Sequence, residues 1–285
     1  MAFATRSLSP QESRVVLALA EEKRREVTRS EIVRLLASSP QASDHVIRSL
    51  RRKGWLARAG WGRYLLIPPD QGPDALGESN VLALASRIVD PYYMGFGTAA
   101  SHYGLTTQHR RLICLVTPRH VRHTKIHETE VRIVNLGPKR FFGYAPVDVL
   151  GYPVMMSDRE KTVLDCIERP DLAGGIGETA QIFATAARRL DWKKASDYLE
   201  RIGSIALIRR FGFLADHVRA EPPGDIYDRL RQATNRPGIS FLGPRKAGRG
   251  AVGHKRKWRL TVNVQAAALA ESAGMGKRRA IKKRR

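Results

Sequence analysis

The stretch 27–68 constrains the fold of this chain more than any other part. It begins with a short apolar helical pattern that Ser30 is placed to cap. A hydroxyl followed by proline, Ser39-Pro40, starts a second helix, which is expected to stop at Gly54. Two short apolar runs around a Gly-Trp-Gly tip follow and predict a β-hairpin. Helix, turn, helix and hairpin in this order predict a winged helix-turn-helix.

The second of these helices has two chemically different faces. At about 100° per residue, its apolar face carries Ser43, Val46, Ile47 and Leu50. The opposite face carries Gln41, His45, Arg48 and Arg52, with Asp44 and Arg51 at the edges. Such side chains reach base edges and phosphates when a helix lies in the DNA major groove. A solvated amphipathic helix is the alternative, and the basic hairpin that follows makes it the weaker interpretation.

From this pattern we predict a set of DNA-binding residues. Arg48 and Gln41 are expected to read bases with help from His45 and Arg52. Two hairpin arginines beside the tip are expected to contact phosphates. The full predicted set is Gln41, Asp44, His45, Arg48, Arg51, Arg52, Arg58, Trp61 and Arg63.

The net charge of +23 is unevenly distributed along the chain. Residues 1–70 hold 13 Lys/Arg and 7 Asp/Glu, whereas residues 71–228 hold 20 and 19 and are nearly neutral. Residues 229–285 hold 17 Lys/Arg and a single acid, Glu271. Both ends therefore favour a polyanionic partner, with binding that is strong and sensitive to salt. The basic loop 243–257 is interpreted either as a second nucleic-acid contact or as a surface loop without a partner.

The remaining patterns predict an α+β chain in three parts. A capping box at Ser9 and Glu12 starts the first helix, whose core face is Val15, Val16, Leu19 and Ala20. We expect a winged helix-turn-helix domain over 1–69, and a larger α/β domain with a sheet and a helical bundle over 70–265. Short β-branched runs predict the sheet over 111–156, and a capping box is expected at 157–160. A basic disordered tail is expected over 266–285.

Patterns that would indicate catalysis or metal binding are weak. Cys114 and Cys166 sit in apolar runs and are expected to be reduced core residues. Three histidines over 120–127 have no cysteine beside them, so a metal site is the minority interpretation. Asp165 and Glu168 are expected on a solvated helix edge. We therefore predict no enzyme activity, no metal and no cofactor.

Most of the chain resembles a known family. The segments on which the resemblance rests are the hairpin GWLARAGWGRYLLIP, then GFGTAASHYGLT, then FFGYAPVDVLGYPVMMSDREKTVLDCIERPDLAGGIGE, and a terminal KWRLTVNV. This succession resembles AbiEi-type antitoxins of bacterial toxin–antitoxin operons. The resemblance implies a phage-defence antitoxin that binds inverted repeats in double-stranded DNA upstream of its own operon and represses it. It also implies antagonism, with or without direct contact, of a co-transcribed toxin with a nucleotidyltransferase fold. The basic C-terminus departs from the family pattern.

Two alternative functions stay open at this point. A winged-helix regulator whose middle domain senses a small ligand would show ligand-dependent shifts in melting. A DNA-targeted nuclease would need a catalytic constellation, and none with suitable spacing is found. The chain has no apolar run long enough for a transmembrane helix and no apolar stretch typical of a signal peptide, so a cytoplasmic location is expected.

Overall fold

The computed structural model describes residues 7–22, 24–60, 62–67, 78–108, 112–126, 129–149, 152–244, 253–265 and 267–269. The chain is a mixed α/β protein with several sheets. It divides into two compact units. The first unit comprises Met1–Tyr92, Thr124–Val131 and Pro146–Val154, and the second comprises Tyr93–His123, Arg132–Ala145 and Met155–Arg285. Within the described residues, no helix combines the length and apolarity needed to cross a lipid bilayer.

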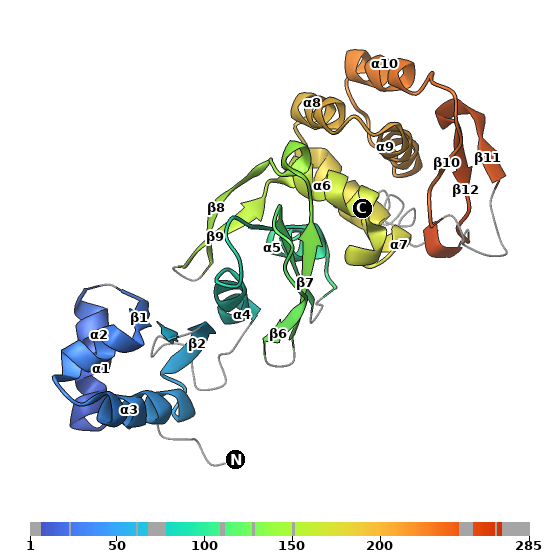
Figure 1. Ribbon diagram of the computed structural model, residues 1–285. Coiled ribbons are helices and arrows are strands. Elements are labelled where there is room, and N and C mark those ends of the chain that lie inside the picture. The colour runs from blue at the N-terminus through green and yellow to red at the C-terminus, as the bar shows by residue number, and fades with distance from the viewer. Residues whose placement is uncertain are drawn as a thin grey trace, which may run out of the picture. The chain divides into compact units, whose positions relative to one another are not determined.

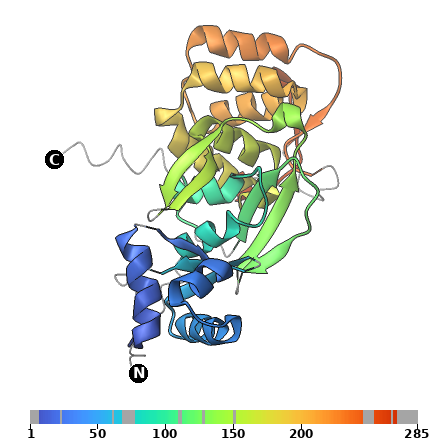
Figure 2. The ribbon, with the colours of Figure 1, turned by 60° about the vertical axis from the view of Figure 1, so that its left-hand side comes forward.

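The described residues in the N-terminal part of the first unit form four helices and a small sheet (Figure 1; Figure 2). In chain order its elements are α1 (Pro10–Glu21), β1 (Glu26–Thr28), α2 (Arg29–Leu36), α3 (Pro40–Arg52), β2 (Leu56–Gly60), β3 (Arg63–Leu66) and α4 (Glu78–Ala85). Strands β2 and β3 form the predicted antiparallel hairpin. Strand β1, which the sequence pattern did not predict, pairs antiparallel with β3, so the sheet order is β1-β3-β2.

Helix α1 begins as predicted. The Ser9 side chain accepts a hydrogen bond from the Glu12 amide, and the Glu12 carboxylate accepts one from the Ser9 amide. Glu12 also pairs with Lys53, which follows α3, at 2.7 Å. Helices α1 and α3 are therefore linked by a buried carboxylate as well as by apolar packing. Of the four predicted core residues of α1, Ala20 is exposed, so that part of the prediction is wrong.

The start of α2 differs from the prediction. Thr28, not Ser30, is the N-cap, and it forms a capping box with Glu31. Thr28 has the extended backbone that an N-cap requires, whereas Ser30 already lies inside the first turn. This two-residue difference places Arg29 at the first helical position, which matters for the site described below.

The hairpin is held on its apolar side. Ala57, Ala59 and Leu65 belong to a small core cluster that also contains Tyr152. The Tyr152 hydroxyl donates a hydrogen bond to the Leu66 carbonyl at 2.7 Å. The guanidinium of Arg25 lies over the Tyr152 ring, 5.3 Å from its centre. The exposed side of the hairpin is thereby left to its polar residues.

Acid should weaken the first unit through Glu12. Burial opposes the ionisation of Glu12, but hydrogen bonds from Lys53, Ser49 and Ser9 outweigh it and lower the pKa of Glu12 from 4.5 to about 2. Because the folded pKa is the lower one, the stabilisation is complete above pH 4.5 and is lost as the pH falls toward 2. Urea unfolding across this window should show a steeper loss of stability for the natural chain than for Glu12→Gln. Equal slopes would contradict the assignment.

A six-stranded mixed sheet follows, as the short strands predicted. Its order is β6-β7-β5-β4-β9-β8. The bounds are β4 (Tyr93–Met94), β5 (Leu112–Thr117), β6 (Thr124–Ile126), β7 (Thr129–Asn135), β8 (Tyr144–Val149) and β9 (Tyr152–Ser157). The two-residue strand β4 lies near the middle, antiparallel to β5 and parallel to β9. The predicted helical bundle is also present in the second unit.

The helices of the second unit pack on one another (Figure 1). They are α5 (Phe96–His102), α6 (Arg159–Glu168), α7 (Ile176–Ala186), α8 (Trp192–Ile202), α9 (Ile205–His217) and α10 (Gly224–Ala233), with 3₁₀ turns η1 (Pro138–Arg140), η2 (Pro170–Leu172), η3 (Ala187–Arg189) and η4 (Arg256–Trp258). Helix α6 starts at an Asp158 cap, because the Asp158 carboxylate accepts the Lys161 amide. The predicted capping box is therefore wrong, since the Ser157 hydroxyl faces Thr162 instead.

A second three-stranded sheet closes the C-terminal part. Its order is β10 (Ser240–Phe241), β12 (Leu260–Val262) and β11 (Gly253–Lys255). The predicted strand from Trp258 is shorter than expected, because Arg256–Trp258 forms η4. Trp258 is buried against α9, and a Cβ built on Gly212 would overlap its ring. Glycine at position 212 is thus required for this tryptophan to dock.

Several predicted boundaries fall on residues that the structure does not describe. The expected linker, 68–73, and the domain boundary near residue 70 lie outside the described residues, so the boundary stays a prediction. Ala267–Leu269 form a helical turn in which Leu269 is buried, so the predicted tail cannot begin at 266. The rest of that tail, 270–285, lies outside the described residues. Both cysteines are buried, as expected for core residues.

Candidate nucleic-acid interface

Helix α3 forms where the sequence predicts it. The Ser39 hydroxyl accepts the Ala42 amide at 3.3 Å, and Pro40 occupies the first turn. The helix ends at Arg52 with Lys53 as its C-cap, and Gly54 follows with a φ of +73°, a conformation that glycine adopts without strain. The predicted start and stop of this helix are both confirmed.

The two faces of α3 are also as predicted. The apolar face is buried, with Ser43, Val46, Ile47 and Leu50 all inside the first unit. Buried Ser43 is satisfied by a contact between its hydroxyl and that of Ser38 at 2.9 Å. The predicted polar residues are exposed, and they are Gln41, His45, Arg48, Arg51 and Arg52. The exposure of this face is confirmed, and its role in DNA binding stays a prediction.

Asp44 has a partner that the sequence did not reveal. The Arg29 guanidinium donates from Nε and Nη2 to the two carboxylate oxygens of Asp44, at 2.7 and 2.8 Å. This hydrogen-bonded pairing with Arg29 lowers the pKa of Asp44, so the carboxylate stays ionised. The pairing also offsets the only negative charge on α3. The face that carries Arg48, Arg51 and Arg52 is therefore electropositive.

Arg29 also joins α3 to the tip of the hairpin. Its backbone amide donates to the Gly62 carbonyl at 2.7 Å while its side chain holds Asp44. The fork of a guanidinium on a carboxylate fixes the geometry of both groups. No periodicity marks Arg29, and only its place at the first position of α2, beside the Thr28 cap, could have singled it out.

The predicted hairpin residues have different surroundings. Arg58 is exposed on β2. Arg63 is exposed on β3 and lies 3.9 Å from the Glu26 carboxylate, which Arg87 holds more closely at 2.6 Å. Trp61, also predicted to contact DNA, lies outside the described residues. The hairpin thus offers two exposed guanidinium groups beside its tip.

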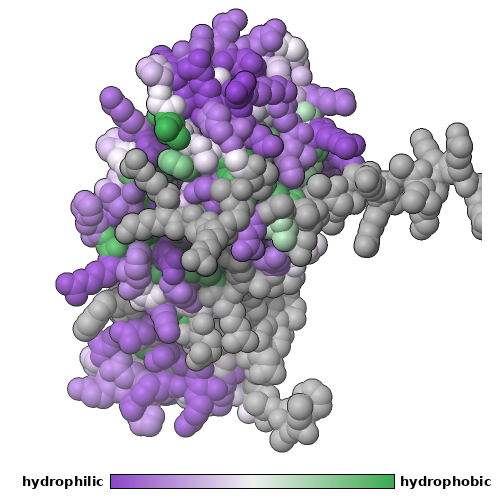
Figure 3. All heavy atoms as spheres, turned by 90° about the vertical axis from the view of Figure 1, so that its right-hand side faces the viewer, coloured by the Kyte–Doolittle hydropathy of each residue, from purple (hydrophilic) through white to green (hydrophobic). Residues whose placement is uncertain are grey.

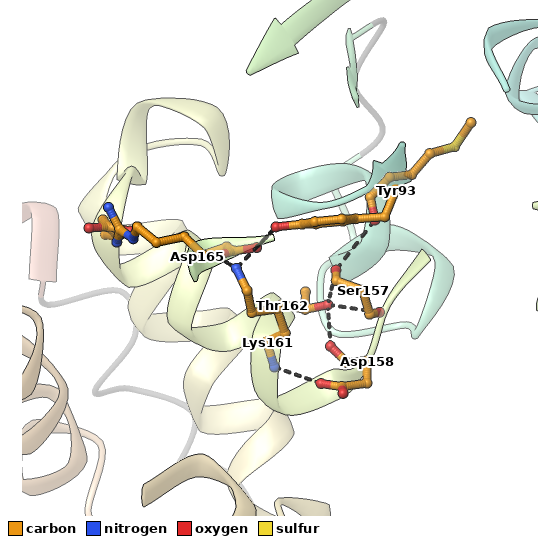
Figure 4. Close-up of polar contacts among 9 residues, drawn as sticks. Tyr93, Ser157, Asp158, Lys161, Thr162 and Asp165 are labelled. Carbon is orange, nitrogen blue, oxygen red and sulfur yellow. Dashed lines mark hydrogen bonds and ion pairs between the residues drawn. The ribbon is translucent and has the colours of Figure 1, made fainter. Parts of the chain in front are cut away.

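The second unit contains a buried charged cluster, which we considered as an alternative site (Figure 4). Lys161 is 1% exposed and forms an ion pair with Asp165, which is 2% exposed. The Tyr93 hydroxyl accepts from Lys161 at 3.0 Å and donates to Asp165 at 3.2 Å. Burial raises the pKa of Asp165, and the adjacent ammonium opposes this rise. Each member is satisfied by the other two, so the cluster is a closed structural network.

This cluster corrects the interpretation of the carboxylates on α6. Asp165 is not on a solvated edge, because α6 is covered on every side along this stretch. Glu168 is only partly exposed and pairs with Arg140. Both carboxylates are therefore committed to cations of the chain.

The histidine-rich segment gives no metal cluster among the described residues. The His123 ring accepts the Ile133 amide through Nδ1 at 3.0 Å. His120 is exposed, and His127 lies outside the described residues. In the first turn of α5, the Thr98 hydroxyl accepts the Cys114 amide at 2.9 Å, so it is used to link α5 to β5.

Comparisons with known proteins bear on the fold. No protein-family profile matches the chain, and no curated protein sequence matches it. Among solved structures, the chain is similar to the crystal structure of the RV2827C protein from Mycobacterium tuberculosis, with a TM-score of 0.69 and 18% sequence identity. The match covers 96% of this chain and 98% of that one. At this identity the likeness shows a shared fold over nearly the whole length and nothing further.

Proposed function

We propose that the protein is a DNA-binding antitoxin that represses its own toxin–antitoxin operon. Elements α1 to β3 act as a winged helix-turn-helix, with α3 as the recognition helix and the β2–β3 hairpin as the wing. The target is duplex DNA with inverted repeats upstream of the operon. The toxin that it counteracts has a nucleotidyltransferase fold. The antitoxin role and the toxin rest on the resemblance of the sequence segments to AbiEi-type antitoxins.

One observation carries the DNA-binding part of this proposal. Helix α3 buries its apolar side and exposes Gln41, Arg48 and Arg52 on the other, while Arg29 neutralises Asp44. A helix of this kind enters the major groove, because its amide and guanidinium groups match base edges there. The neighbouring hairpin arginines supply contacts to phosphates, which position the helix without reading sequence.

Two substitutions separate base reading from phosphate contact. Arg48→Ala should cost about 1–3 kcal/mol of binding free energy and should relax sequence preference, because the lost group reads a base. Arg63→Ala should instead weaken binding to all duplexes about equally. The measurement is a titration of each variant with the chain's own upstream DNA and with a scrambled duplex of equal length.

A control variant and a contradicting result complete this experiment. Arg14→Ala removes an exposed arginine from α1 and should leave both affinities unchanged. If Arg48→Ala keeps the full preference of the natural chain for the upstream DNA, α3 is not the recognition helix. A reporter gene under the upstream region then tests repression, with the same variants expressed in trans.

A further inference from the structure

The C-terminal sheet carries a concentration of cations with no acid of its own. Residues 229–269 contain no Asp or Glu in the sequence. Around β11, η4 and the turn before β10, four cationic side chains besides Lys257 are exposed. We call them the C-terminal basic surface, and they are Arg236, Lys255, Arg256 and Arg259. Figure 3 shows that the upper part of the molecular face, over α10, is mostly hydrophilic.

The segment that carries most of these cations is anchored by a hydrogen-bond network. Trp258 is 1% exposed, and its indole Nε1 donates to the Asp216 carboxylate at 2.7 Å. The same carboxylate accepts from the Tyr227 hydroxyl at 3.0 Å and pairs with Lys257 at 2.7 Å. Three donors therefore hold Asp216 and anchor η4 on α9. The described end of the predicted basic loop 243–257 therefore forms β11 and the start of η4.

Only some of the cations in this segment are neutralised by an acid. Lys257 is used to satisfy Asp216, whereas Lys255 and Arg256 have no carboxylate within ion-pair distance among the described residues. Arg259 donates to the Asn235 side chain at 2.9 Å and to the Arg236 carbonyl at 3.4 Å. Its guanidinium is thus held against the side chain of Asn235 and the backbone of Arg236. Exposed positive charge without a neighbouring acid to compensate it is the property of a surface that binds polyanions.

We propose that the C-terminal basic surface binds the phosphate backbone of duplex DNA without regard to sequence. Counterion release from the duplex supplies the free energy, as it does for any array of lysines and arginines on DNA. This contact is separate from base reading by α3 and does not require it.

Two observations favour a duplex over other polyanions. Proteins that bind single strands stack bases on exposed aromatic rings. On the described part of this surface, Trp258 is buried and both Phe241 and Tyr227 are only partly exposed. Membrane-surface binding needs a set of exposed apolar side chains. Ile239, which is 73% exposed, is the one large apolar side chain exposed here among the described residues.

The test uses the full chain with Lys255→Gln and Arg256→Gln together, and a short duplex of scrambled sequence. Each phosphate contact contributes about 0.9 to the slope of log affinity against log salt, so the slope should fall by about 1.8. Between 50 and 200 mM salt, the double variant should therefore lose about 10-fold less affinity than the natural chain. Circular dichroism checks that the variant is folded.

A matched control removes the same charge elsewhere. Arg188→Gln with Arg189→Gln takes two exposed arginines from η3 and should leave the slope unchanged. Equal slopes in the two double variants would mean a general charge effect and would overturn the proposal. So would tighter binding to a single strand or to anionic phospholipid vesicles than to the duplex.

The same experiment in an Arg48→Ala background separates this surface from α3. The residual, sequence-independent binding of Arg48→Ala should still depend on Lys255 and Arg256. One outcome is that this residual binding depends on Lys255 and Arg256 while Arg48→Ala keeps its sequence preference. That outcome would contradict α3 as the recognition helix and would support the C-terminal basic surface. The opposite outcome is that Arg48→Ala loses sequence preference while the salt slope does not change when Lys255 and Arg256 are replaced. That outcome would support α3 as the recognition helix and would contradict the C-terminal basic surface.

Discussion

Replacing Lys161 with methionine should lower the free energy of unfolding by about 3–5 kcal/mol. The ammonium of Lys161 is the cation that faces Asp165, and both side chains are almost completely buried. Methionine fills similar space but leaves a carboxylate in an apolar interior without its counter-charge. Asp165 must then either stay ionised at a high desolvation cost or take up a proton. Urea unfolding followed by circular dichroism at neutral pH gives the loss directly.

Paired substitutions distinguish charge from shape in this cluster. Lys161→Met with Asp165→Leu removes both charges, and apolar replacement of a buried ion pair is often neutral or stabilising. The double variant should therefore regain most of the stability that Lys161→Met loses. It still leaves the Tyr93 hydroxyl without either partner, and Tyr93→Phe in the same background should recover about 1–3 kcal/mol more. A double variant as unstable as Lys161→Met would show that packing, not charge, dominates.

Raising salt from 50 to 200 mM should weaken binding to the proposed upstream DNA by about 10³-fold. This magnitude follows if on the order of six phosphates are neutralised, since log affinity falls linearly with log salt. Arg51 and Arg52 at the end of α3 and Arg63 on the hairpin are exposed sources of such contacts. Fluorescence anisotropy with a labelled duplex measures the slope.

The contribution of α3 to that slope is isolated by charge-matched variants. Arg51→Gln with Arg52→Gln should reduce the slope by about 1.8, whereas the η3 pair, Arg188→Gln with Arg189→Gln, should not. Carrying out the comparison with Lys255→Gln and Arg256→Gln already in place removes the second basic surface from the result. Affinity that does not respond to salt would rule out a phosphate-based interface altogether.

The α3 face was predictable from sequence because it depends on local rules. A hydroxyl cap, a proline in the first turn and a glycine after the last turn fix the ends of the helix. The 3.6-residue period then decides which side chains face inward, and Val46, Ile47 and Leu50 are buried accordingly. None of these signals requires knowledge of a distant residue.

What could not be predicted depends on partners far away in the sequence. Asp44 looks like an isolated acid on a basic helix until Arg29 is placed beside it. Lys161 and Asp165 have the spacing of an ordinary exposed helix pair, and only burial of all sides of α6 reveals them as core residues. Strand β4 is too short to show a period of two, yet it joins β5 to β9 in the middle of the sheet.

The docking of Trp258 against Gly212 restricts how this chain can change over evolutionary time. While the indole of Trp258 packs at this place, position 212 has room for no side chain larger than a hydrogen atom. A larger residue there would expel the tryptophan, and Asp216 would lose one of its donors in the same event. Gly212 and Trp258 are therefore expected to change together. Relatives that share this arrangement should keep both residues or replace both.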